Sequence, residues 1–108
     1  ALSSTMVYGE VFNMMVEPDG YVGKTIRMRG LYYASYYDVT EQYYHFVIIQ
    51  DATACCAQGL EFLWTGEHTY PDDYPENETK VEVTGVWERY EEDGETYYRI
   101  QADDFHVV

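Results

Sequence analysis

The first apolar pattern along the chain has the spacing of a helix. Val7, Val11 and Met14 recur at intervals that place them on one helical face. Hydroxyl side chains at residues 3–5 can accept hydrogen bonds from the first turn, and the Pro-Asp-Gly segment at 18–20 is typical of a helix end. The pattern therefore predicts one amphipathic helix over residues 4–17, with its apolar face in the core.

After Gly23 the apolar positions alternate with polar ones, which is the spacing of a β-strand. Ile26 and Met28 begin the first such segment, and Gly30 interrupts it. A glycine within a strand often marks a bulge or a sharp bend, and a small barrel needs such a bend if its first strand is to pair on two sides. We therefore expect one long, bent strand that begins near residue 24.

Further strand-like segments follow at residues 43–50, 60–64, 80–90 and 96–101, and residues 105–108 extend the last of them. The Asp93-Gly94 pair predicts a tight hairpin between the last two strands. Prolines and acidic residues between positions 65 and 79 predict a solvated loop.

These elements predict a mainly β fold, a five-stranded OB-fold-like barrel with one N-terminal α-helix. The 108 residues form a single domain, with the helix at 4–17 and the barrel at 24–108. In OB folds a helix commonly lies between the third and fourth strands, whereas here it precedes the first. An antiparallel α+β sandwich is the alternative architecture.

The net charge of the chain limits the classes of partner that it can bind. Six Lys and Arg residues against 20 Asp and Glu residues give a net charge of −14, which repels the phosphates of nucleic acids. We therefore expect no nucleic-acid partner. No apolar run approaches the ~18 residues of a membrane span, so we expect membrane contact only through an N-terminal anchor that has been removed.

The adjacent Cys55 and Cys56 have the most distinctive chemistry. Neighbouring Cα atoms lie about 3.8 Å apart, less than the roughly 4.4 Å at which the usual disulfide span begins. A bond between the two cysteines would be strained and easily reduced, which favours a redox switch over a structural link. The alternative is that one cysteine packs in the core as a small hydrophobic residue and the other is incidental.

The same pair makes its loop a candidate site for a ligand or a metal. Small flanking residues let the backbone approach a ligand closely, and thiolates are soft donors that favour zinc or copper(I). Two thiolates leave a tetrahedral ion short of ligands, so a histidine or a second protein molecule has to complete the set. The predicted ligand-binding residues are Cys55, Cys56, Gln58 and Tyr43, and the predicted zinc ligands are Cys55, Cys56 and His45, with His68 as the alternative histidine. The alternative for His45 is an ordinary hydrogen-bonded polar residue.

Residues 21–32 (YVGKTIRMRGLY) and 46–57 (FVIIQDATACCA) resemble the soluble domain of a family of bacterial two-component permease subunits. The shared features are a Gly-Lys strand start with a later glycine and a strand that runs into Cys-Cys-Ala. The resemblance covers about half of the chain and departs from the family at Gln58, where an acidic residue is usual. It implies an OB-like, extracytoplasmic domain with a loose link to metal homeostasis and no established reaction. A stand-alone envelope protein or lipoprotein is the better analogue, so we expect an extracytoplasmic protein that is in the bacterial cell envelope or secreted.

Tyrosine is the remaining unusual feature. Six of the 13 tyrosines crowd the first hairpin, and such side chains suit contacts with carbohydrate, peptide or protein. Alternatively, they simply cover a small barrel. Since no catalytic motif is present, we expect a non-enzymatic binding or accessory module of the bacterial cell envelope, whose partner is an envelope protein or a small ligand. The alternatives are a thiol-redox protein and an OB domain that binds oligosaccharide or protein through surface tyrosines.

Overall fold

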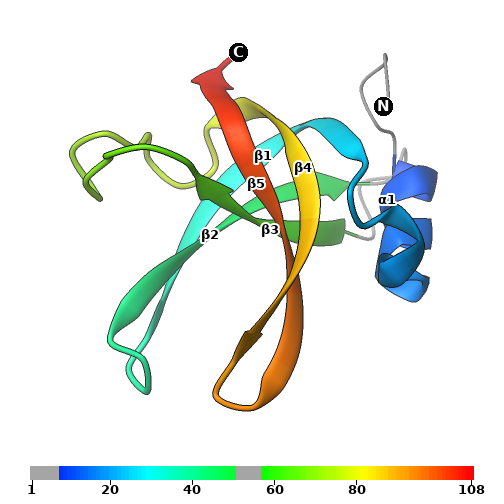
Figure 1. Cartoon of the computed structure of the whole chain (residues 1–108). Helices are drawn as coiled ribbons and strands as arrows, with labels where there is room; N and C mark the ends of the chain where they lie inside the picture. Colours follow the sequence, from blue (N-terminus) through cyan, green and yellow to red (C-terminus); the bar gives the residue numbers. More distant parts are fainter. Residues whose placement is uncertain (1–7, 51–56) are drawn as a thin grey trace.

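The computed structural model describes residues 8–50 and 57–108 and shows five strands closed into a barrel, preceded by one short helix (Figure 1). The elements are α1 (Tyr8–Val16), the 3₁₀ helix η1 (Pro18–Tyr21), β1 (Thr25–Tyr37), β2 (Gln42–Gln50), β3 (Ala57–Trp64), β4 (Lys80–Glu92) and β5 (Glu95–Val107). This confirms the mainly β class and is compatible with the OB-like barrel. The sandwich alternative is wrong, because the strands form one closed sheet.

The strand order around the barrel is β1-β2-β3-β5-β4, and β1 also pairs with β4. Residues 25–31 of β1 pair with β4, whereas residues 31–37 pair with β2. Gly30 lies at this change of partner, and a Cβ atom built there would stand 2.3 Å from the carbonyl oxygen of Ile48. Only glycine tolerates that approach, so the predicted bend in the first strand is confirmed.

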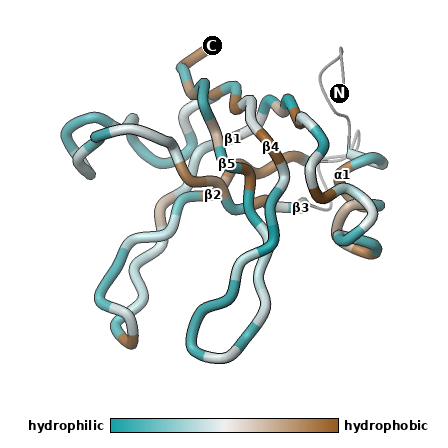
Figure 2. The backbone as a smooth tube through the Cα atoms, viewed as in Figure 1, coloured by the Kyte–Doolittle hydropathy of each residue, from teal (hydrophilic) through white to brown (hydrophobic). Residues whose placement is uncertain are grey.

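The core fills the barrel and continues onto α1. Val11 and Met14 of α1 are fully buried beside the barrel residues Leu60 and Trp87. The indole Nε1–H of Trp87 also donates a hydrogen bond of 3.0 Å to the carbonyl oxygen of Pro18. Figure 2 shows the hydrophobic stretches gathered where the strands cross, while the end of the β4–β5 hairpin is hydrophilic. The helix and η1 therefore close one end of the barrel.

The opposite end of the barrel lies beside the segment 65–79, which is the predicted loop (Figure 1). Two long hairpins, β1–β2 and β4–β5, extend beyond the barrel in the same direction, and a hydrogen bond from the Tyr44 hydroxyl to Glu92 joins them. Asp93 and Gly94 both have positive φ, as the predicted tight hairpin requires. The helix predicted over residues 4–17 is present at 8–16, and residues 4–7 lie outside the described part of the chain.

Candidate ligand-binding site

His45, one of the predicted zinc ligands, lies on the inner face of β2 near the segment 65–79. Its ring stacks on Tyr74 with 4.3 Å between centroids, and its Nδ1 atom lies 2.8 Å from the hydroxyl of Tyr32. Phe62 and Tyr70 contribute further ring contacts at 6.1 and 5.4 Å. The imidazole is therefore held within an aromatic cluster.

Burial lowers the pKa of His45 to about 4, so its imidazole is neutral at pH 7. Burial also raises the pKa of Tyr32, whose protonated hydroxyl shares a hydrogen bond with Nδ1. A neutral imidazole can ligate a metal, but the contacts described around it come from aromatic rings and a tyrosine hydroxyl, and none comes from a carboxylate, a thiol or a second imidazole. This geometry suits a hydrogen-bonded histidine of the barrel interior.

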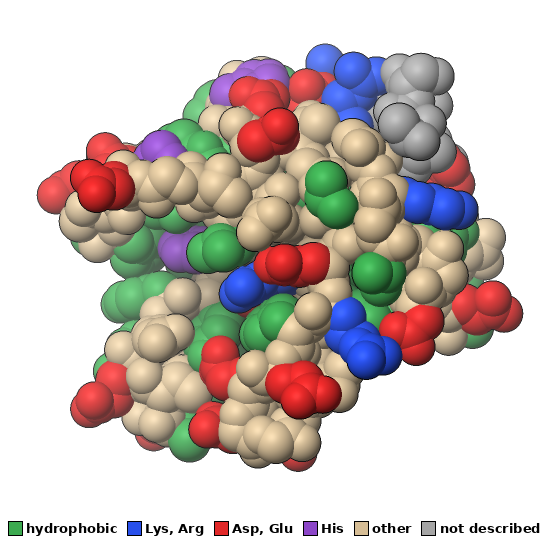
Figure 3. All heavy atoms as spheres, in the orientation of Figure 1, with side chains coloured by type: hydrophobic (Ala, Val, Ile, Leu, Met, Phe, Trp, Pro, Cys, Tyr) green, Lys and Arg blue, Asp and Glu red, His purple; other side chains and the backbone are tan. Residues whose placement is uncertain are grey.

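Tyr43 and Gln58, two of the predicted ligand-binding residues, lie far apart. Tyr43 is 48% exposed, and its ring centroid is 4.4 Å from that of Tyr70 and 5.0 Å from that of Tyr36. Figure 3 shows the surface hollowed between the segment 65–79 and the β1–β2 hairpin, which contribute these rings. Gln58 instead pairs with Ile49, about 20 Å along β2 from Tyr43. The β2–β3 hairpin therefore does not bring the two predicted residues together.

Cys55 and Cys56 lie outside the described residues. The predicted thiolate zinc site and the predicted redox pair thus stay predictions. His45 is five positions from Gln50, the last described residue of β2 before the cysteines.

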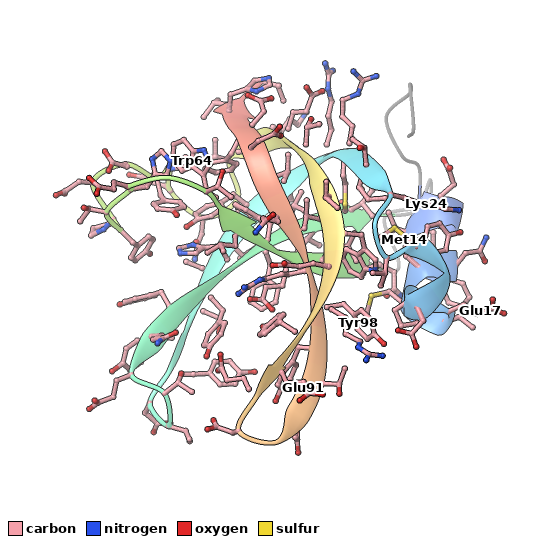
Figure 4. The ribbon with its side chains drawn as sticks, in the orientation of Figure 1. Met14, Glu17, Lys24, Trp64, Glu91 and Tyr98 are labelled. Carbon is pink, nitrogen blue, oxygen red and sulfur yellow. The ribbon has the colours of Figure 1, made fainter. Side chains whose placement is uncertain are left out.

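A pocket that the sequence analysis did not predict lies between α1, the outer face of β2 and β3, and the β4–β5 hairpin. Its volume is about 270 Å³. The walls are mostly apolar and come from Met14, Met15, Pro18, Phe46, Gly59, Leu60, Trp87, Tyr97 and Tyr98, with Glu61 and Thr96 among the polar members. Met14 of α1 and Tyr98 of β5 flank the space between the helix and the hairpin in Figure 4.

Glu61 is the charged group among the described residues that line this pocket, and it is partly buried on β3. One carboxylate oxygen accepts a hydrogen bond of 2.5 Å from the hydroxyl of Tyr90. Among the described residues, no hydrogen bond is made to the other oxygen. Burial raises the pKa of Glu61, although the Tyr90 hydrogen bond and the nearby Arg99 oppose the shift.

Further charged and aromatic groups surround this carboxylate. The guanidinium of Arg99 lies 4.1 Å from the ring centroid of Tyr90, and its Nε–H donates a 2.6 Å hydrogen bond to Glu88. The charges of Glu88 and Glu92 add to the raised pKa of Glu61. In the described part of the chain, three carboxylates and one guanidinium therefore meet here, and their summed charge is negative.

The sequence pattern gives little indication that Glu61 belongs to a binding site. It is the charged residue within the apolar run of residues 60–64, at a position that alternation places on the outer face of a strand. An outward charge ordinarily contacts water. Here the β4–β5 hairpin folds over it, so Tyr90 and Arg99 reach the same surface from a distant part of the sequence.

A separate polar group lies on β4 and β5. Glu82, Asp104 and His106 hold ligand-type atoms within 4.8 Å of one another. Arg29 donates a 2.8 Å hydrogen bond to Glu82, and His106 Nδ1 lies 2.9 Å from an Asp104 oxygen. Since Arg29 already engages Glu82, we interpret this group as a surface network of ion pairs and hydrogen bonds.

The sequence matches no protein-family model and no curated protein. In the described ranges, no helix has the length and apolar character needed to cross a membrane.

Proposed function

We propose that this protein is a non-enzymatic binding module that takes its ligand on the outer face of β2 and β3, beneath the β4–β5 hairpin. The observation that carries this proposal is the pocket of about 270 Å³, in which apolar walls surround one partly buried carboxylate. An apolar pocket with a few convergent polar groups is the usual form of a binding site. OB barrels take their ligands on this strand face.

The groups around Glu61 favour binding over catalysis. Its neighbours are a tyrosine hydroxyl and an arginine that is paired with Glu88. Nucleophilic catalysis needs an activated nucleophile beside an oriented base. The described lining of the pocket holds no serine, cysteine or histidine that would supply this pair.

The cellular setting stays a prediction. The resemblance of residues 21–32 and 46–57 favours an extracytoplasmic module of the bacterial cell envelope and a link to metal homeostasis. The rival, a thiol-redox protein, depends on Cys55 and Cys56 and is independent of the pocket. Counting alkylated thiols in oxidised and reduced samples tests the rival, which fails if neither cysteine changes reversibly.

The proposed function is tested by blocking the pocket. Thr96 lines it from an exposed position on β5, so Thr96→Trp fills the opening with little effect on folding. Val107→Trp is the matched control, because Val107 is 59% exposed and lies outside the pocket lining. Both variants and the unmodified protein are applied to a glycan array and to a displayed peptide library.

We expect ligands that the unmodified protein and Val107→Trp both retain and that Thr96→Trp loses. Equal retention by all three proteins contradicts a site in this pocket. Turnover of a small substrate by the purified protein contradicts the non-enzymatic assignment.

A further inference from the structure

We infer that the pocket takes a basic peptide segment, and that Glu61 pairs with one lysine or arginine side chain of that segment. This inference rests on the proposed function, because it names the ligand class of the same pocket. Three observations support it: the negative charge around the pocket, the shape and lining of the pocket, and the contacts of Arg99 beside Glu61.

The negative charge of the protein and of the pocket surroundings favours a cationic ligand. The chain carries a net charge of −14, and acidic side chains lie over much of the face shown in Figure 3. Around the pocket, Glu88 and Glu92 add to the charge of Glu61. A carboxylate, phosphate or sulfate group would meet this field as a like charge, whereas an ammonium or guanidinium group would be attracted.

The contacts of Arg99 show how this surface can hold a cation. Its guanidinium lies 4.1 Å from the ring centroid of Tyr90 and pairs with Glu88 at 2.6 Å. An aromatic face beside a carboxylate is a favourable environment for arginine or lysine. Arg99 is engaged by Glu88, and no described residue donates a hydrogen bond to the second oxygen of Glu61, which we take as the partner of the ligand cation.

The walls suit the aliphatic part of such a side chain. Phe46, Leu60 and Met15 border the pocket near Glu61 and offer apolar contact to a methylene chain. A volume of about 270 Å³ lies just below the ~300–1,000 Å³ typical of small-molecule pockets, so the pocket fits one long side chain.

The mouth of the pocket favours a peptide over a free amine. Met15 and Tyr97 line the pocket and are 49% and 41% exposed, and Phe12 of α1 is 47% exposed nearby on the same helix. Apolar side chains next to the basic residue of a peptide can pack on these groups. A free polyamine has no such side chains, so it would leave this apolar rim in water.

The test titrates acetylated and amidated pentapeptides into isotopically labelled protein, followed by amide chemical shifts. The probes are Ala-Leu-Lys-Leu-Ala, the same peptide with arginine, norleucine or glutamate at the centre, and spermidine. The proteins are the unmodified chain, Glu61→Gln, Thr96→Trp and the control Glu91→Gln, which removes the same charge from an exposed site on the β4–β5 hairpin (Figure 4).

We expect the lysine and arginine peptides to shift the amides of Phe46, Leu60 and Tyr97 in the unmodified protein. Glu61→Gln should weaken them about tenfold or more, because a charge-assisted hydrogen bond is lost, whereas Glu91→Gln should leave the affinity unchanged. Thr96→Trp should abolish the shifts. The amide spectrum of each free variant verifies its fold.

Several results overturn the inference. One is binding of the norleucine or glutamate peptide as tightly as the lysine peptide, and another is unchanged affinity in Glu61→Gln. A third is spermidine binding at least as tightly as the peptides, and a fourth is no binding by any basic peptide at millimolar concentration. If Thr96→Trp nevertheless loses a glycan or a neutral peptide, the proposed function stands and only the ligand class is wrong.

Discussion

Two titratable side chains lie almost back to back on the β2–β3 ladder, and their surroundings differ. His45 pairs with Phe62 and projects to the barrel interior, whereas Glu61 pairs with Phe46 and projects to the outer face. Each contacts one tyrosine hydroxyl, at 2.8 Å for His45 and 2.5 Å for Glu61. Burial shifts both pKa values toward the neutral form, downward for the histidine and upward for the glutamate.

His45 and Glu61 differ in what lies next to their side chains, and this difference indicates different roles. Rings pack around His45, the closest being Tyr74 at 4.3 Å. Glu61 instead borders a cavity and keeps one carboxylate oxygen without a partner among the described residues. A shifted pKa therefore reports burial in both regions. The cavity, and the carboxylate oxygen to which no described residue donates a hydrogen bond, are what point to a ligand at Glu61.

The largest expected effect is the loss of stability when Tyr32, whose hydroxyl contacts His45, is replaced. Tyr32 is fully buried and contacts four aromatic rings, so Tyr32→Ala should lower the free energy of unfolding by about 3–5 kcal/mol. The corresponding change Tyr90→Ala, at the partner of Glu61, should cost less, because Tyr90 is only partly buried. Urea denaturation of both variants measures the difference.

If Tyr32→Ala does not fold, Tyr32→Phe removes only the hydroxyl and should cost about 1–2 kcal/mol, since Nδ1 of His45 loses its hydrogen-bond partner. Equal costs for the two alanine variants would contradict the distinction between a packed interior region and an open outer one.

The second effect is a pH dependence of stability that comes from His45. Its pKa is about 4 in the folded protein and about 6.5 in the unfolded chain, so the unfolded state binds the proton more tightly. Stability should therefore fall as the pH drops from about 6.5 to 4, by about 2 kcal/mol after a discount for partial exposure. His45→Gln removes the titration and should show a shallower loss over this window.

Glu61 contributes with the opposite sign, because its raised pKa makes the folded state bind the proton more tightly at acidic pH. The comparison of unmodified protein with His45→Gln isolates the histidine. Identical pH profiles would show that His45 is not buried in its neutral form.

The third effect concerns the stability cost of the binding carboxylate. Glu61→Gln should leave folding unchanged or stabilise it by roughly 0.5 kcal/mol at pH 7, since the amide oxygen still accepts from Tyr90 and the desolvated charge is gone. Thermal or urea denaturation checks this outcome. A loss above about 2 kcal/mol would indicate a structural carboxylate, as opposed to one kept for a ligand.

The smallest expected effect is on zinc binding by the reduced protein. Because the described neighbours of His45 are aromatic rings, His45→Gln should leave any zinc affinity unchanged. Calorimetry of this variant beside Cys55→Ser and Cys56→Ser tests the predicted metal site. A loss of zinc affinity in His45→Gln would show that His45 is a zinc ligand. Equal zinc affinity in the two serine variants and the unmodified protein would exclude thiolate ligands.

The sequence by itself determined the strands and their turns. Alternation, the bend at Gly30 and the hairpin at Asp93-Gly94 are local properties, because the pleat and the allowed φ values are set by a few neighbouring residues. The closed barrel also followed from the number and order of these strands. Alternation along β2 also puts His45 and Val47 on the same face, where Val47 belongs to the core and the His45 ring contacts the buried Tyr32.

Only the tertiary structure decided where the helix docks and what surrounds each polar group. The pattern at Glu61 is that of an exposed strand residue, and its burial arises because β4 and β5 carry Tyr90 and Arg99 over it. Tyr43 and Gln58, predicted together, are separated by the length of the β2–β3 ladder. Alternation assigns a side chain to a face of a strand, but which distant segment covers that face depends on long-range packing.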